Sequence, residues 1–107
     1  MEIFNRFYDK ENLIRKTVEI DNDLYDKLKE ISQSKYNTST NMLINVCIED
    51  LIKKQNIKLY MKEDAYSTTK HSLLIKESFA KELEIMKEKY NISFSKLINI
   101  AIKNAIS

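Results

Sequence analysis

This 107-residue chain contains one pattern twice, over residues 15–52 and again over residues 70–106. Each copy has a short alternating segment, a segment of periodic apolar residues, the dipeptide Tyr-Asn, and a second periodic apolar segment. The copies are offset by 55 residues in their first parts and by 54 in their later parts, so the first copy has one extra residue in between. A repeat of this kind predicts that the fold is built from two similar units.

Each copy predicts one strand followed by two helices. Residues 15–20 and 70–75 alternate in polarity along most of their length, which is the period of a half-buried strand. The next segment has apolar residues at spacings of three and four, typical of an amphipathic helix; these are Leu24, Leu28 and Ile31, and then Phe79, Leu83 and Met86. The last helix has a wide apolar face, made by Leu43, Ile44, Cys47, Ile48, Leu51 and Ile52, and then by Leu97, Ile98, Ala101, Ile102, Ala105 and Ile106.

The turns between the helices are predicted from asparagine and serine, because the chain contains no glycine and no proline. Asn37 and Asn91 stand where a helix commonly ends in the left-handed conformation, which asparagine tolerates. Ser39 and Ser93 follow as expected N-caps of the second helices. Tyr36 and Tyr90 recur identically, which favours packing beneath the turn.

We divide the chain into an N-terminal arm (residues 1–14), a first repeat (15–54), a linker (55–69) and a second repeat (70–107). A lone strand leaves its backbone groups unpaired, and about 38 residues is too few for an adequate core, so each repeat needs a partner. The simplest partner is the other repeat, with the two strands antiparallel. The predicted class is therefore mainly α with a two-stranded antiparallel β-ribbon, although exchange of repeats between two chains stays open.

Composition excludes several classes of function. Phosphate-cradling loops need glycine, which is absent, and the single Cys47 and single His71 allow neither a thiolate zinc cluster nor a two-histidine metal site. No catalytic, metal or cofactor site is predicted, and we expect no enzyme activity. No apolar stretch approaches the ~20 residues of a membrane span, and the first residues do not resemble a signal peptide, so a cytoplasmic location is expected. Cys47 and His71 are predicted to be structural.

The doubled strand-helix-turn-helix pattern resembles the ribbon-helix-helix DNA-binding superfamily of the MetJ and Arc type. The segments that carry the likeness are TVEIDNDLYDKLKEI with NTSTNMLINVCIEDLI, and SLLIKESFAKELEIM with NISFSKLINIAIKNAI. Two copies in one chain are similar to the tandem TraY-type accessory proteins of conjugative plasmids. The resemblance implies an intramolecular pseudo-dimer that binds double-stranded DNA, as a transcriptional regulator or as a plasmid transfer or maintenance protein. The family's usual glycine between the helices is asparagine here.

The resemblance also implies which residues meet DNA, since the ribbon of this superfamily enters the major groove. The outward ribbon positions, expected to contact bases, are Arg15, Thr17, Glu19, Lys70, Ser72 and Leu74. Flanking phosphates would meet the starts of the second helices, at Ser39, Thr40, Ser93 and Phe94. The two strands differ at every outward position, so the ribbon is expected to recognise an asymmetric site.

Two outward residues favour a different class of function. Glu19 repels phosphate, and an exposed Leu74 is typical of a protein interface. The net charge of +2 is also small. The alternative is a protein-interaction module, such as an antitoxin, with DNA binding secondary or lost. The apolar arm, which contains Ile3, Phe4 and Phe7, would then contact a partner, such as a further copy on adjacent DNA, a relaxase or a toxin; otherwise it covers the core of its own chain.

Overall fold

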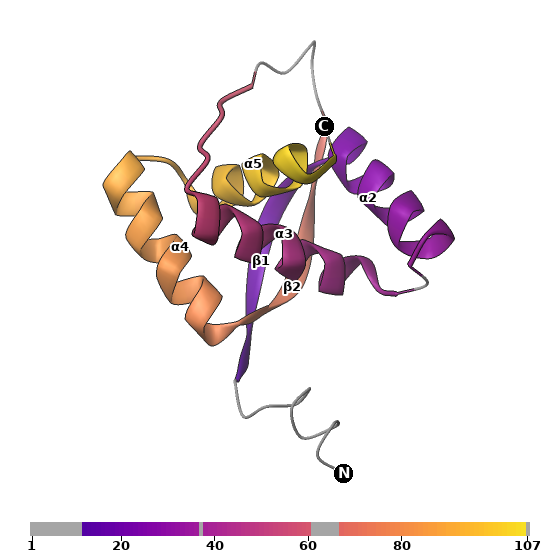
Figure 1. Ribbon diagram of the computed structural model, residues 1–107, viewed down its shortest axis with the longest axis horizontal. Coiled ribbons are helices and arrows are strands. Elements are labelled where there is room, and N and C mark those ends of the chain that lie inside the picture. Colours follow the sequence, from indigo (N-terminus) through magenta and orange to yellow (C-terminus); the bar gives the residue numbers. More distant parts are fainter. Residues whose placement is uncertain (1–11, 37, 61–66, 107) are drawn as a thin grey trace.

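The computed structural model describes residues 12–36, 38–60 and 67–106, which form a two-stranded sheet and four helices (Figure 1). In chain order the elements are β1 (Leu13–Asp21), α2 (Asn22–Ser34), α3 (Thr40–Lys54), β2 (Thr68–Lys76), α4 (Glu77–Tyr90) and α5 (Phe94–Ile106). A mainly helical fold with a two-stranded antiparallel sheet is thereby confirmed. None of the described helices combines the length and the apolar character needed to cross a membrane.

The two strands pair over their full length of nine residues, from Leu13 opposite Lys76 to Asp21 opposite Thr68. Thr17 lies opposite Ser72 at the centre, and these two residues occupy the same position in the two repeats. Both strands begin two residues before the predicted repeat boundaries, so β1 takes the end of the predicted arm and β2 the end of the predicted linker.

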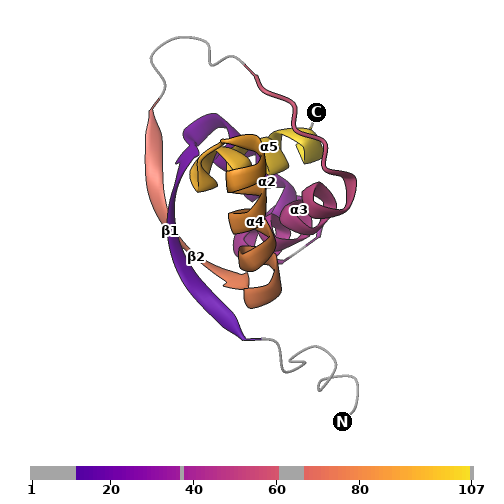
Figure 2. The ribbon, with the colours of Figure 1, turned by 90° about the vertical axis from the view of Figure 1, so that its left-hand side faces the viewer.

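The ribbon lies on one side of the molecule and the helices lie on the other (Figure 2). Alternation along the strands turns Val18, Ile20, Leu73 and Ile75 into the core, where all four are buried. α3 and α5 pack against each other beneath the ribbon, with α2 and α4 on the flanks. Most of the predicted helical core residues are buried as well, whereas Ala105 is exposed.

Most of the predicted helix ends that fall within the described residues are confirmed. The Ser39 and Ser93 hydroxyls accept from the backbone N–H groups of Met42 and Lys96, each at 3.1 Å. Asn91 adopts the left-handed conformation with φ of 55° at the end of α4. Asn37, for which the same conformation was predicted, lies outside the described residues. Gln55 also has a positive φ, of 53°, and this was not predicted.

The single cysteine and the single histidine both pack within the fold. Cys47 is buried, and that burial raises the pKa of its thiol to about 11. The His71 ring stacks on Tyr25 with 3.9 Å between centroids, and burial lowers the pKa of the imidazole. The prediction for the paired tyrosines is half wrong: Tyr90 packs on the core, but Tyr36 is 62% exposed.

Candidate nucleic-acid interface

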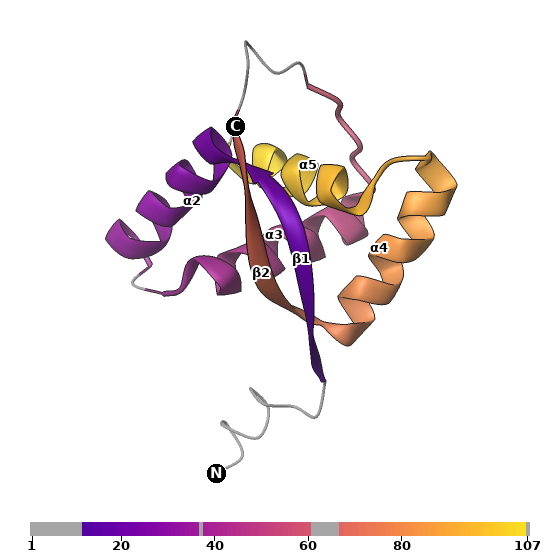
Figure 3. The same ribbon diagram turned by 180° about the vertical axis from the view of Figure 1, so that it is seen from behind.

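The outward face of the ribbon brings together the six side chains that the sequence singles out. In the strand register they form three cross-strand pairs, namely Arg15 with Leu74, Thr17 with Ser72, and Glu19 with Lys70. All six are exposed, and none of the described helices covers this face (Figure 3). The Arg15 guanidinium donates to the Ser72 hydroxyl at 2.9 Å, so this side chain lies across the ribbon.

Charge is spread unevenly over this face. Arg15 and Lys70 stand on different strands, four register positions apart, which corresponds to roughly 13 Å along the ribbon. Glu19 lies directly opposite Lys70, where the two charges offset each other. Lys76 adds a third exposed cation at the end of β2. The face is therefore basic at its Arg15 and Lys76 end and nearly neutral at the other.

The predicted phosphate-contacting residues lie in the first turns of α3 and α5, but their side chains are already engaged. Ser39 and Ser93 cap their own helices, and the Thr40 hydroxyl lies 3.2 Å from that of Ser32. The Phe94 ring packs beneath the Lys16 ammonium, 5.2 Å from the ring centroid. An anion at these positions would therefore be bound by backbone amides and the helix dipole.

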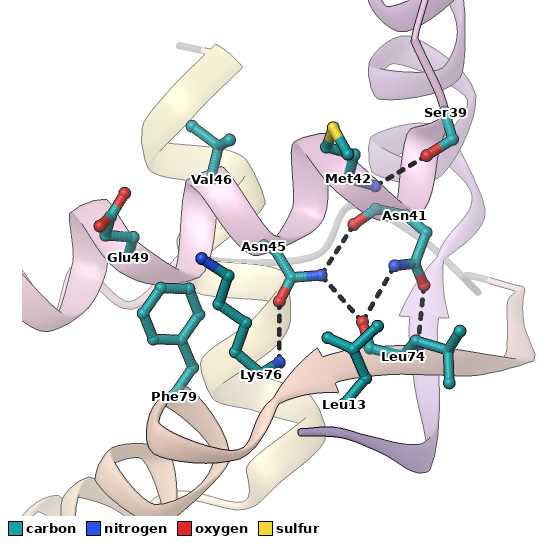
Figure 4. Close-up of a pocket in the computed structure, with 10 residues that line it drawn as sticks. All are labelled: Leu13, Ser39, Asn41, Met42, Asn45, Val46, Glu49, Leu74, Lys76 and Phe79. Carbon is teal, nitrogen blue, oxygen red and sulfur yellow. Dashed lines mark hydrogen bonds between the residues drawn. The ribbon is translucent and has the colours of Figure 1, made fainter. Parts of the chain in front are cut away.

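Asparagine side chains fasten each of these helices to the nearest edge of the ribbon. In the first half, the Asn45 amide donates to the Leu74 carbonyl at 2.8 Å and accepts from the Lys76 N–H at 3.2 Å. Asn41 bonds both backbone groups of Leu74, each at 2.9 Å (Figure 4). The outer backbone groups of Leu74 and the N–H of Lys76 are thereby bonded without a third strand.

The same attachment recurs in the second half of the chain. The Asn99 amide donates to the Glu19 carbonyl and accepts from the Asp21 N–H, both at 2.9 Å. The Ser95 hydroxyl accepts from the Glu19 N–H at 3.0 Å. Both second helices therefore start at a ribbon edge, one on each side of the outward face.

Sequence reasoning missed these asparagines, although a signal was present. The tripeptide Leu-Ile-Asn recurs at residues 43–45 and 97–99, and only its apolar members were given a role. An amide repeated at the same place in an apolar helix face indicates a buried polar contact, because such a group needs a partner.

Comparisons of the chain with protein-family models, with curated proteins and with solved structures each give no match.

Proposed function

We propose that this chain is a sequence-specific double-stranded DNA-binding protein that inserts its ribbon into the major groove. The observation that carries the proposal is the outward ribbon face, with its polar side chains exposed and aligned across two strands. A two-stranded ribbon fits the major groove, which is about 12 Å wide. The starts of α3 and α5 at the two ribbon edges suit the phosphates on either side, since backbone amides at helix starts bind anions.

We further propose that the two halves form an intramolecular pseudo-dimer of ribbon-helix-helix repeats. The central pair, Thr17 and Ser72, joins equivalent positions of the two repeats, as a two-fold axis between them would require. Asn45 and Asn99 are also equivalent, and each bonds the ribbon edge nearest its own helix. Because the paired side chains differ, such a ribbon recognises a site without two-fold symmetry.

In this proposal each outward side chain contacts a different chemical group on the base edges. Arg15 and Lys70 donate to guanine acceptors, and Glu19 accepts from a cytosine amino group. Thr17 and Ser72 bond several base edges, and Leu74 contacts a thymine methyl. We propose that this DNA binding controls transcription, or that it supports the transfer or maintenance of a plasmid.

The test is selection of bound fragments from random duplex DNA, followed by affinity measurements at two salt concentrations. We expect a non-palindromic consensus, bound less tightly as salt rises because phosphate contacts release counterions. Arg15→Ala with Lys70→Ala should lose ~1–3 kcal/mol for each base contact removed. Lys53→Ala with Lys54→Ala is the matched control, because it removes the same charge at the far end of α3 from the ribbon edge.

Equal affinity of the two double variants would contradict the ribbon mechanism. Absence of any enriched sequence would favour the second candidate, a protein-interaction module such as an antitoxin. The observation on its side is apolar exposure at one end of the ribbon, where Leu13 is 54% exposed beside Leu74. That candidate predicts a protein partner, such as a toxin, that copurifies with the chain.

A further inference from the structure

An open apolar groove of about 380 Å³ lies beside the first half of α3, next to the end of β2 (Figure 4). Apolar side chains from four elements line it, namely Leu13 of β1, Met42 and Val46 of α3, Leu74 of β2 and Phe79 of α4. Met42 is 43% exposed and Val46 is 54% exposed. Lys76 and Glu49 supply charges at its border. The described part of the chain therefore leaves sizeable apolar surface open at this place.

The equivalent surface on the other half of the molecule is closed. Val46 corresponds to Ile100 in the repeat, and Ile100 is 0% exposed. Phe79, which is half-buried, corresponds to Leu24, which is buried. Equivalent apolar positions of the two repeats are thus exposed or half-buried beside the groove and buried in the other half of the molecule.

The residues that follow α3 close the surface on α5. Tyr60 lies over it: its hydroxyl donates to Asp21 at 2.5 Å, and the ammonium groups of Lys96 and Lys103 lie 5.5 and 5.8 Å from the ring centroid. Asn104 donates to the backbone carbonyl of Asn56 at 2.8 Å. Residues 56–60 are therefore bound along α5, and Ile57 and Tyr60 pack against the core.

The N-terminal arm repeats the order of residue types found in this covering segment, although no residue is identical. Ile57-Lys58-Leu59-Tyr60 and Met1-Glu2-Ile3-Phe4 share the order apolar, charged, apolar, aromatic, and a basic residue follows each aromatic after one further position. Tyr60 stands eight residues before β2, and Phe4 stands nine residues before β1. The same order of residue types thus occurs at nearly the same distance upstream of both strands.

The connection back to the ribbon is also equivalent. Tyr60 bonds Asp21, and Asp21 is the register partner of Thr68, where β2 begins. In the other half Lys76, at the groove, is the register partner of Leu13, where β1 begins. The start of β1 therefore lies at the groove, as the start of β2 lies opposite the residue that Tyr60 bonds.

We propose that the N-terminal arm of the same chain binds this groove, with Phe4 in the place that Tyr60 takes on α5. The groove chemistry fits a phenyl ring: Met42 and Glu49 stand where α5 has Lys96 and Lys103, so a thioether replaces a cation against the ring. Glu49 can meet Arg6, two residues after Phe4. This inference concerns the fold of the arm and does not rest on DNA binding.

Methyl NMR on the full-length chain tests the arm directly. A phenyl ring held against α3 shifts the methyl signals of Met42 and Val46, so Phe4→Leu should move both signals. Phe7→Leu is the matched control, because it removes a ring from the same arm outside the repeated pattern, and it should leave both signals in place. Unchanged signals in Phe4→Leu, or movement in Phe7→Leu alone, would overturn the proposal.

Disulfide formation then identifies which chain supplies the arm. Asn5→Cys with Glu49→Cys should give a cross-link within one chain, seen as a compact monomer on a non-reducing gel at every protein concentration. Asn5→Cys with Lys103→Cys is the control; it should remain unlinked because Tyr60 occupies that side. If Asn5→Cys with Glu49→Cys gave a disulfide-linked dimer, the occupant of the groove would be the arm of a second copy. If it gave no disulfide, the groove would be open. Either result refutes binding by the chain's own arm.

Discussion

Replacing Asn99 by alanine removes most of the attachment between α5 and β1, leaving the bond from the Glu19 N–H to Ser95, and keeps the apolar core intact. Two hydrogen bonds to the ribbon are lost, one to the Glu19 carbonyl and one from the Asp21 N–H, and the latter lies in a buried setting. A third bond, to the Ser95 carbonyl within α5, is lost with them. A typical intramolecular hydrogen bond contributes about 1 kcal/mol, and a buried group left without a partner costs ~1–3 kcal/mol. We therefore expect Asn99→Ala to lower the free energy of unfolding by roughly 2–4 kcal/mol.

The equivalent substitution in the other half should cost less, because Asn41 and Asn45 both donate to the same carbonyl there. In Asn45→Ala the Leu74 carbonyl keeps its bond from Asn41, and only the exposed Lys76 N–H loses its side-chain acceptor. The expected loss is about 1 kcal/mol. Asn104→Ala, which removes a single amide donor from the same helix as Asn99, is the control and should cost about as little.

Urea unfolding followed by far-UV circular dichroism measures all three variants. If Asn99→Ala lost no more stability than Asn104→Ala, the ribbon edge would not depend on Asn99, contrary to this prediction. A loss in Asn45→Ala as large as that in Asn99→Ala would refute the role assigned to Asn41.

Two further predictions concern single positions. Asn91→Ala should cost about 1 kcal/mol in unfolding free energy, because φ of 55° disfavours a residue with a Cβ and no local hydrogen bond, whereas Asn91→Gly should cost nothing measurable; equal losses would contradict this. Burial lowers the pKa of His71 below its ordinary value of 6.5, a shift partly opposed by Asp26, so the folded chain favours the neutral ring. Its contribution to stability should be full above pH 6.5 and fall as the pH drops below that value, and the urea midpoint of His71→Gln should fall less over the same range.

Patterns that recur in both repeats predicted most of the fold. Features that depend on backbone pairing or on contacts distant in sequence were not predicted. Alternation located both strands because one ribbon face is buried, but it did not locate their first residues, Leu13 and Thr68, which belong to the ladder through backbone pairing. Asn91 was predicted to adopt the left-handed conformation because asparagine tolerates it better than most other residues that have a Cβ. Gln55 was not, since its conformation is supported by contacts distant in sequence, including a hydrogen bond from the Tyr90 hydroxyl at 2.7 Å.

The candidate site was predicted in outline for the same reason. Period-two alternation was enough to name the six outward side chains, and all six share one exposed face. At the helix starts the caps formed by Ser39 and Ser93 were predicted, but the contacts of Thr40 with Ser32 and of Phe94 with Lys16 were not. Which polar atoms remain available depends on neighbours that only the fold brings together.

The long separation between the paired strands has a consequence for how this chain acquires its structure. Leu13 pairs with Lys76 and Asp21 with Thr68, so every ribbon pair joins residues 47 to 63 positions apart. During synthesis β1 and both helices of the first half leave the ribosome well before their partner strand exists. Local helices form within microseconds, whereas ribbon closure must overcome the entropy of a long loop, so the ribbon is expected to be the last element completed. Until then the edge of β1 is a template for any matching strand, and refolding at high protein concentration should yield dimers that have exchanged halves.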